Sequence, residues 1–241
     1  KSISRLQGLR HTSTLALVTT ITAFAVGSTF AVQYTWQGTT DSTWATASNW
    51  NANGVAQTGG SFVHRLNVTT SAANSSKPAT YNFPGITTTY TGDLASGSRG
   101  LVIGSAGTNA GVNSTMVISG GTFSTLGSAL GTDIIGNGST NIGTLTIDGT
   151  SNAGDAHYIG TNLGTAMGLG FGSTATLNVK NGSATIAALI TNNTTATINL
   201  DTGGTLAMNG MTYSGGGNNI FNFDGGTITA RATNALSLIH I

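Results

Sequence analysis

The sequence predicts an all-β protein whose short strands stack as a parallel β-solenoid. Three observations predict this fold: only 6% of the 241 residues are charged, 36 residues are glycine, and strands of alternating apolar residues recur with glycine turns between them. Globular proteins usually hold ~25% charged residues. A disordered chain normally has high net charge and few β-branched residues, whereas this chain has a net charge of +1. The composition therefore favours many short strands joined by tight turns.

Residues 1–31 predict a signal peptide. Lys1, Arg5 and Arg10 precede an apolar run over residues 15–26, and small residues follow it up to Ala31. The run has the length usual for a signal peptide and is short for a ~20-residue membrane span, which leaves a retained anchor as the alternative. We expect cleavage after Ala31, no membrane span in the mature chain, and a secreted or cell-surface location in a bacterium.

Charge and cysteine content exclude several classes of function. After residue 31 the chain keeps five basic residues and seven aspartates, and it has no glutamate, so its net charge is −2. Such a chain has no basic patch that would attract nucleic acid. It also contains no cysteine, which excludes disulfides and thiolate metal sites.

Residues 32–95 predict a tryptophan-containing N-terminal cap and the first coils. All three tryptophans of the chain, Trp36, Trp44 and Trp50, lie in this region. Two interpretations are open for them. Exposed rings could stack on the sugars of a glycan, or buried rings could close the open end of the first coil, as the ends of solenoids require. We favour the cap.

Residues 96–235 predict the β-solenoid repeats. An apolar residue at every second position is typical of a strand with one buried face, and the Gly or Asn-Gly that follows suits a turn. Such strands cover residues 115–123, 144–150, 176–183, 197–206 and 220–228, and shorter apolar runs ending in glycine cover 101–104, 133–136 and 157–160. At ~20–25 residues per coil we expect roughly eight coils and a rod roughly 40 Å long.

An antiparallel sandwich or barrel is the alternative architecture, because its hairpins also need glycine turns. Asn and Thr recur at matched places beside the turns of this chain. Side chains at matched places can form hydrogen-bonded ladders from coil to coil, and this favours the solenoid.

Residues 34–230 carry a family resemblance. Residues 36–50 read W-x-G-x-x-D-x-x-W-x-x-x-x-N-W, and the later repeats read L-x-I-G and T-L-x-I-x-G-G-x. This pattern resembles secreted bacterial proteins with autotransporter-associated β-strand repeats, many of them planctomycete or verrucomicrobial surface proteins with a PEP-CTERM sorting signal. The resemblance implies a right-handed parallel β-helix, a surface or extracellular role, and no common enzymatic activity.

The C-terminal end departs from that family. Neither a PEP-CTERM tail nor a translocator barrel follows the repeats, and residues 236–241, Leu-Ser-Leu-Ile-His-Ile, break the Gly/Thr/Asn pattern. We interpret residues 236–241 as a non-native tail and the chain as a fragment, which leaves the mode of surface anchoring open.

Three aspartates, Asp148, Asp201 and Asp224, fall at the same place in their repeats. If the coils are in register, their carboxylates could line one edge as a cation-binding ladder. The alternative is an Asx-turn, in which each carboxylate caps its own turn. We favour the turn, because Ser119 and Lys180 take the equivalent place in other repeats.

The remaining motifs predict no catalytic, cofactor or metal site. His64, His157 and His240 are isolated in the sequence, whereas a metal needs several convergent ligands. Residues 215–226 contain one imperfect match to a calcium-binding nonapeptide. The sequence has no serine-hydrolase motif with a following Asp and His.

We therefore expect an exported structural or adhesive solenoid without catalytic activity. Its expected partners are extracellular polysaccharide or other cell-surface components. The alternative is a polysaccharide-binding or polysaccharide-degrading, pectin-lyase-like β-helix, which needs clustered carboxylates or a poised base. A third hypothesis is the passenger fragment of an autotransporter.

Overall fold

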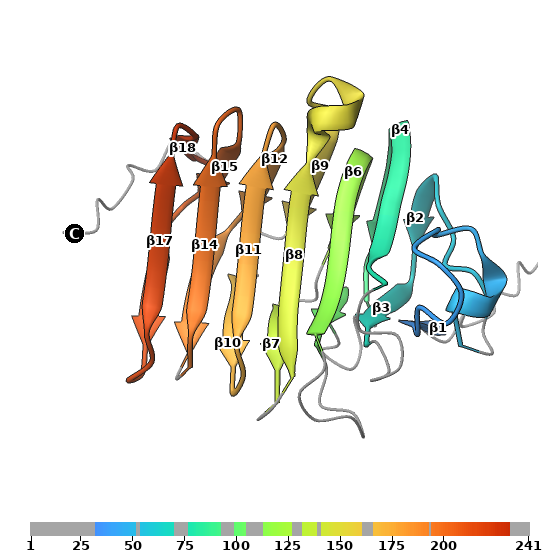
Figure 1. The fold of residues 1–241 in the computed structure, drawn as a ribbon, viewed down its shortest axis with the longest axis horizontal. Helices are drawn as coiled ribbons and strands as arrows, with labels where there is room; N and C mark the ends of the chain where they lie inside the picture. Colours follow the sequence, from blue (N-terminus) through green and yellow to red (C-terminus); the bar gives the residue numbers. More distant parts are fainter. Residues whose placement is uncertain are drawn as a thin grey trace, which may run out of the picture.

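The computed structural model describes residues 32–51, 54–69, 77–92, 99–104, 113–126, 132–138, 141–160, 166–192 and 194–231. These residues form an elongated stack of strands that runs from β1 at one end to β17 and β18 at the other (Figure 1). The predicted signal peptide and tail lie outside the described residues. All pairs of named strands are parallel, so the predicted all-β parallel β-helix is confirmed and the antiparallel sandwich is wrong.

One face of the stack, face A, is a seven-stranded parallel sheet to which each coil gives one strand. Its strands in spatial order are β1 (Val32–Trp36), β3 (His64–Val68), β5 (Leu101–Ile103), β7 (Asp133–Asn137), β10 (Ala166–Phe171), β13 (Ala188–Asn192) and β16 (Met211–Ser214). The spatial order equals the chain order, which is the arrangement expected of stacked coils.

The second sheet bends into two faces. The first parts of β4 (Ala79–Tyr90) and β6 (Asn113–Thr125) belong to face B, and their second parts belong to face C. Face B continues with β8 (Ile142–Asp148), β11 (Ala175–Lys180), β14 (Ala196–Asp201) and β17 (Asn219–Asp224). Face C begins with β2 (Gly60–Phe62) and continues with β9 (Ala156–Gly160), β12 (Ser183–Ile186), β15 (Thr205–Met208) and β18 (Thr227–Ala230).

The corner between faces B and C depends on glycine. Gly121 has φ +79°, and a Cβ built on it would lie 2.1 Å from the carbonyl oxygen of Phe83 in the preceding coil. Only glycine combines that backbone conformation with that close approach. Two short 3-10 helices, η1 (Ala47–Asn49) and η3 (Gly149–Asn152), are the helical segments among the described residues.

The described chain makes seven coils, where the sequence predicted roughly eight. Paired residues in neighbouring coils are 21 and 23 positions apart between β11, β14 and β17, but 37 positions apart between β4 and β6. The predicted 20–25-residue period therefore holds in the C-terminal coils and is wrong for the N-terminal ones, where longer segments join the strands.

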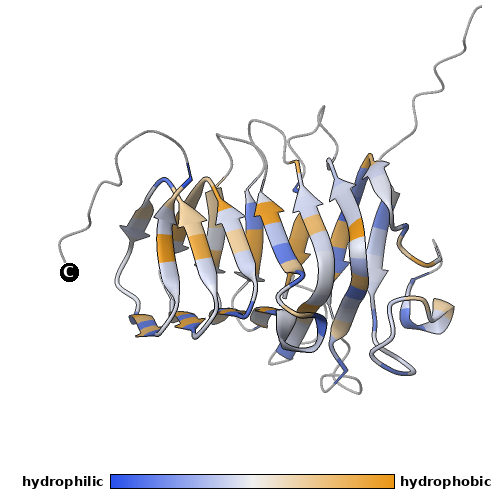
Figure 2. Ribbon diagram, turned by 90° about the horizontal axis from the view of Figure 1, so that it is seen from above, coloured by the Kyte–Doolittle hydropathy of each residue, from blue (hydrophilic) through white to orange (hydrophobic). Residues whose placement is uncertain are grey.

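The core is a set of stacked apolar columns inside the coils. Hydrophobic and hydrophilic residues alternate along the strands (Figure 2), and one cluster of buried side chains extends from Tyr34 to Met208. One column on face B contains Tyr81, Ile118, Ile147, Val179, Leu200 and Phe223. Its members are fully buried except Phe223 on the last coil, which is 56% exposed. Each coil thus buries the apolar side of its neighbour, the main source of stability in such a stack.

One carboxylate lies inside this core. Asp133 at the start of β7 is 5% exposed. Its oxygens accept hydrogen bonds from the backbone N–H of Leu101 (2.8 Å), the hydroxyl of Tyr158 (2.6 Å) and the hydroxyl of Thr125. Burial raises the pKa of Asp133, and these hydrogen bonds oppose that rise without cancelling it. The network joins strands β5, β6, β7 and β9 of two successive coils.

Candidate functional site

The three tryptophans fill the N-terminal end of the stack. Trp36, Trp44 and Trp50 are 0%, 2% and 4% exposed. Trp44 packs edge-on against Trp50, Tyr81 and Phe123, with ring centroids 4.8, 5.4 and 6.2 Å apart. Its ring therefore contacts aromatic residues of the second and third coils. This burial supports the predicted cap, and the glycan-stacking interpretation is wrong for these rings, which offer no open face to a sugar.

The indole N–H groups of the cap are all hydrogen-bonded. Trp44 Nε1 donates to the carbonyl oxygen of Ala56 (2.9 Å), Trp50 Nε1 to that of Trp44 (2.7 Å), and Trp36 Nε1 to that of Lys77 (3.3 Å). A buried indole N–H without an acceptor would cost stability. These hydrogen bonds therefore hold the three indole rings in place, and the bond to Lys77 links the cap to the loop before β4.

The polar residues of the W-x-G-x-x-D motif hold the cap loop. Asn49 is fully buried, its Oδ1 accepts the backbone N–H groups of Thr40 and Asp41, and its Nδ2 donates to Asp41 Oδ1 at 2.7 Å. The backbone N–H of Thr43 and the Asn49 amide both donate to Asp41, and together they lower its pKa. Gly38 has φ +59°, and a Cβ there would lie 2.9 Å from Trp36 Nε1. Each of these motif residues thus has a structural role.

Face B presents a regular grid of polar side chains to solvent. Thr115, Thr144, Thr176 and Thr197 form one outward column. The next column contains Thr146, Asn178, Asn199 and Asn222, whose side chains form a hydrogen-bonded ladder. Asn178 Nδ2 donates to Thr146 Oγ1 (3.0 Å), Asn199 Nδ2 to Asn178 Oδ1 (2.7 Å), and Asn222 Nδ2 to Asn199 Oδ1 (2.7 Å). The predicted ladder is confirmed.

The aspartates at matched repeat positions form the third outward column of face B. Asp148 pairs with Lys180, and Asp201 pairs with Asp224. Asp148 accepts the backbone N–H of Thr150 at 3.0 Å, so the Asx-turn is confirmed there. Its burial acts to raise its pKa, but the hydrogen bonds from Thr150 and the charge of Lys180 lower it overall. Within the described ranges no three acidic or histidine side chains gather as a metal site.

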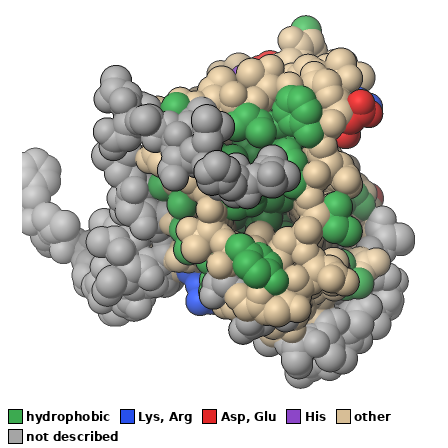
Figure 3. All heavy atoms as spheres, turned by 90° about the vertical axis from the view of Figure 1, so that its left-hand side faces the viewer, with side chains coloured by type: hydrophobic (Ala, Val, Ile, Leu, Met, Phe, Trp, Pro, Cys, Tyr) green, Lys and Arg blue, Asp and Glu red, His purple; other side chains and the backbone are tan. Residues whose placement is uncertain are grey.

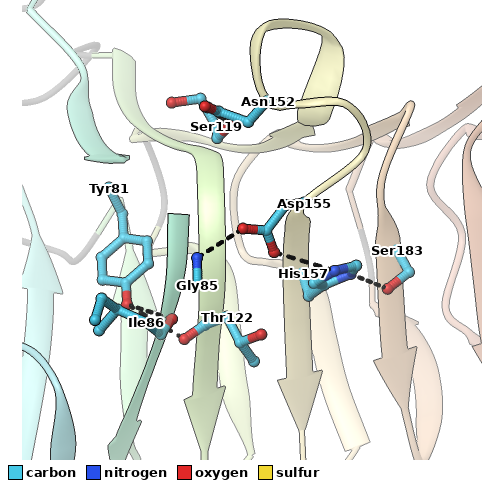
Figure 4. A network of polar contacts seen from close by, with 9 residues as sticks. All are labelled: Tyr81, Gly85, Ile86, Ser119, Thr122, Asn152, Asp155, His157 and Ser183. Carbon is cyan, nitrogen blue, oxygen red and sulfur yellow. Dashed lines mark hydrogen bonds and ion pairs between the residues drawn. The ribbon is translucent and has the colours of Figure 1, made fainter. Parts of the chain in front are cut away.

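His157 is not isolated, which corrects the sequence prediction. Figure 4 shows its ring between Asp155 and Ser183 on face C. His157 Nδ1 is 2.8 Å from Ser183 Oγ, and Nε2 is 3.5 Å from Asp155 Oδ1. The other oxygen of Asp155 accepts the backbone N–H of Gly85 at 2.8 Å. The sequence held a signal for this network: Asp155 and His157 are two residues apart at the start of a strand, which directs them to one side.

Ser183 could not be assigned to this network from sequence spacing alone. It is 26 positions after His157 and becomes its neighbour only through the parallel register of β9 and β12. A shallow groove of about 490 Å³ adjoins it, with Thr150, His157, Asn181, Ser183 and Thr205 among its lining residues. Asn181 Nδ2 donates to Thr150 Oγ1 at 2.9 Å across the groove.

The arrangement differs from a nucleophilic triad. In a triad the serine faces histidine Nε2 while the carboxylate hydrogen-bonds Nδ1–H. Here the two ring nitrogens are exchanged, and the side chains of His157 and Asp155 are each 36% exposed. Asp155 and the neighbouring Asn152 instead connect distant coils, because Asn152 Nδ2 donates to Asn82 Oδ1 (3.0 Å) and to the carbonyl oxygen of Ser119 (2.5 Å). The hydrogen bonds of Asp155 and Asn152 therefore stabilise the corner between faces B and C.

Among the described residues, His64 and the nonapeptide-like segment gather no ligands for a metal. His64 stacks on Phe62 and contacts Gln57 Oε1 at 2.9 Å, and its burial lowers its pKa. His240 lies outside the described residues. Most of residues 215–226 form β17 and its flanking turns, so this segment is one more coil of the stack.

No protein-family model matches this chain, and no curated protein or solved structure is significantly similar to it. In the part of the chain that the structure describes, no helix has the length and apolar character needed to cross a membrane. The class that the fold defines is thus a parallel β-solenoid with an aromatic cap.

Proposed function

We propose that the protein is an exported bacterial protein of the cell surface or extracellular matrix that acts as a structural and adhesive scaffold without catalytic activity. The single observation that supports this proposal best is the outward grid of face B. Its threonine and asparagine columns repeat in register over successive coils, and side-chain hydrogen bonds join the members of the asparagine column. A flat, repeating, hydroxyl- and amide-rich surface suits many weak contacts with an equally repetitive partner.

The partner that we propose is extracellular polysaccharide. Its repeating hydroxyl groups match the donors and acceptors of the grid, and neither side depends on charge. The export that this function needs rests on the sequence of residues 1–31.

Adhesion is tested by adsorption of the purified chain to insoluble polysaccharides. We expect Thr176→Glu combined with Asn199→Glu, on face B, to weaken adsorption at least about tenfold, because a strongly hydrated carboxylate must lose water to contact the polysaccharide where a hydroxyl or amide did before. The matched control is Thr185→Glu with Ala207→Glu on face C, which should adsorb like the unchanged protein. Equal loss in both variants would contradict a role for face B.

Export is tested separately by producing the chain with and without residues 1–31 in a bacterial host. We expect only the longer form to leave the cytoplasm, with mass spectrometry placing its new N-terminus at Val32. Retention of the intact N-terminus would support the membrane-anchor alternative.

A second candidate, a polysaccharide-binding or polysaccharide-degrading β-helix, is favoured by the groove beside His157 and Ser183. It predicts the release of reducing ends from a polysaccharide, and loss of that release in His157→Ala and Ser183→Ala. Our proposal predicts no such release from the unchanged protein and unchanged adsorption in both variants.

A further inference from the structure

The outward grid of face B is regular in two directions. Along the stack, Thr115, Thr144, Thr176 and Thr197 occupy the same position in four successive coils. Neighbouring parallel strands lie ~4.8 Å apart, and outward residues on one strand lie ~6.6 Å apart, since every second side chain points to the same face. The pairing from β6 through β8, β11 and β14 to β17 keeps one register along each pair of strands. Both spacings therefore repeat without interruption over this part of the face.

The side chains of this grid are held in place. Threonine is branched at Cβ, which restricts its side chain to few conformations in a strand. In the adjoining column, Asn178 Nδ2 donates to Thr146 Oγ1, and Asn199 Nδ2 donates to Asn178 Oδ1. The threonines and asparagines of β8, β11 and β14 in both columns are half-buried. Hydroxyl and amide groups that are fixed in this way also fix the positions of the waters that bind them.

The grid is also uncharged. The described members of the threonine and asparagine columns are all neutral residues, whereas Asp148, Lys180 and Asp201 lie in the next column, toward the corner with face C. Seen along the stack from its C-terminal end, most described side chains are uncharged and the few acidic ones lie near the margin (Figure 3). A charged group keeps its own hydration water strongly, because removing that water is costly. A neutral grid therefore suits a neutral, ordered ligand.

We propose that face B also binds ice. Each oxygen of the ice lattice is hydrogen-bonded to its neighbours, so an ice surface is a rigid, neutral array of donors and acceptors, and its repeat distances are close to the two spacings of the grid. Waters held on the threonine hydroxyls and between the columns can thus join the lattice with little displacement, and many weak contacts act together. This inference goes beyond polysaccharide adhesion and does not depend on it.

The threonine column sets the size of the contact. Its four members span three steps of ~4.8 Å, or roughly 14 Å along the stack. Thr176 lies inside this column, with Thr144 and Thr197 as its neighbours in the adjacent coils. A large side chain at residue 176 would therefore hold the whole grid away from a flat crystal surface, so that a single substitution should remove most of the contact.

Partition of the purified chain into slowly grown ice tests the proposal. We expect the unchanged protein to enter the ice, and Thr176→Tyr to show at least about a tenfold lower ratio of protein in ice to protein in the liquid. The matched control is Thr185→Tyr, an outward position on face C, which should enter the ice like the unchanged protein. Tyrosine is favourable in strands, and circular dichroism checks that both variants keep their β structure.

Three results would each overturn the proposal: exclusion of the unchanged protein from the ice, uptake of Thr176→Tyr equal to that of the unchanged protein, or an equal loss of uptake in Thr185→Tyr. Adsorption of the same samples to insoluble polysaccharide separates this inference from the proposed function. Adsorption to polysaccharide without uptake into ice would overturn the ice proposal alone. Uptake into ice without adsorption to polysaccharide would support the ice proposal and overturn the polysaccharide partner alone.

Discussion

The two ends of the described stack differ in how far their apolar side chains are buried. A parallel β-solenoid has an open end wherever its last coil has no neighbour. At the N-terminal end the cap inserts Trp44 against Tyr81 and Phe123, so no aromatic ring of the cap core remains exposed. At the C-terminal end Tyr213 and Phe223 remain more than half exposed. Similar apolar residues are thus buried at one end of the described stack and exposed at the other.

The N-terminal and C-terminal coils also differ in their length and in the contacts that join them. Near the cap, paired residues are up to 37 positions apart, and coils are joined by individual polar contacts such as the hydrogen bond from Trp36 Nε1 to the carbonyl oxygen of Lys77. Near the open end, pairs are 21 to 23 positions apart and the contacts are repeated ladders. We infer that the N-terminal coils depend on individual residues, whereas the C-terminal coils spread stability over equivalent ones. The following substitutions test this contrast.

The largest effect is expected from Trp44→Ala. Removing a fully buried aromatic side chain costs about 3–5 kcal/mol in free energy of unfolding, and Trp44 is 2% exposed. Phe223→Ala in the last described coil should cost about 1 kcal/mol, because more than half of Phe223 is exposed. Urea denaturation followed by circular dichroism measures both. Equal losses would remove the distinction between the two ends.

Asn49→Ala should give the next largest effect. It leaves the buried backbone N–H groups of Thr40 and Asp41 without their acceptor, and each unsatisfied buried group costs about 1–3 kcal/mol. Asn49→Asp is the control: it keeps the acceptor but places a second carboxylate beside Asp41, so we expect it also to destabilise the chain at pH 7 and to recover near pH 3. A fully stable Asn49→Ala variant would show that the motif does not hold the cap.

Asp133 predicts a pH dependence of stability in the middle of the stack. Its carboxyl has a higher pKa in the folded chain than the ordinary value of 3.8, so the folded state retains its proton to higher pH. The contribution of Asp133 to the free energy of unfolding is therefore greatest below about pH 4 and falls as the pH rises through the folded pKa. Asp41 and Asp148, with lowered pKa values, contribute the opposite slope.

The readout is the difference between the unchanged protein and Asp133→Asn, which cannot titrate at this position. Urea unfolding from pH 3 to pH 7 should show the unchanged protein losing stability relative to the variant as the pH rises. The reverse trend would mean that the hydrogen bonds of Leu101 and Tyr158 outweigh burial.

The smallest effect is expected in the ladder of face B. Asn199→Ala removes hydrogen bonds to Asn178 and Asn222 and should cost about 0.5–1.5 kcal/mol. Asn222→Ala, which removes a single exposed bond, should cost less than about 0.5 kcal/mol. A larger loss of unfolding free energy for Asn222→Ala than for Asn199→Ala would contradict the view that each ladder hydrogen bond adds a similar amount to stability.

The sequence predicted the repeating part of the fold well because period-two alternation and glycine turns are local signals. Leu177, Val179 and their partners in β14 have this alternation, and they pair as neighbouring coils. The number of coils was harder to predict, since strand spacing in the sequence does not reveal where the chain between strands leaves the stack. The corner at Gly121 explains why one continuous run, β6, serves two faces.

The site was only partly predictable for a related reason. The cap interpretation of the tryptophans followed from the need to close an end, and the Asx-turn of Asp148 followed from local spacing. The network of Asp155, His157 and Ser183 depends on coil-to-coil register, which is a long-range property. The buried position of Asp133 likewise arises because its partners Leu101, Thr125 and Tyr158 come from other strands, two of them in the preceding coil.

The central claim is that successive coils lie directly above one another in parallel register. Thr80 and Asn222 lie in one outward column of face B, five coils apart, and Asn199 is one coil nearer. Spin labels on cysteines introduced at residues 80 and 222 should lie roughly 24 Å apart, and labels at 80 and 199 roughly 19 Å, at ~4.8 Å per coil. Distances that do not grow with coil number would contradict the stacked arrangement.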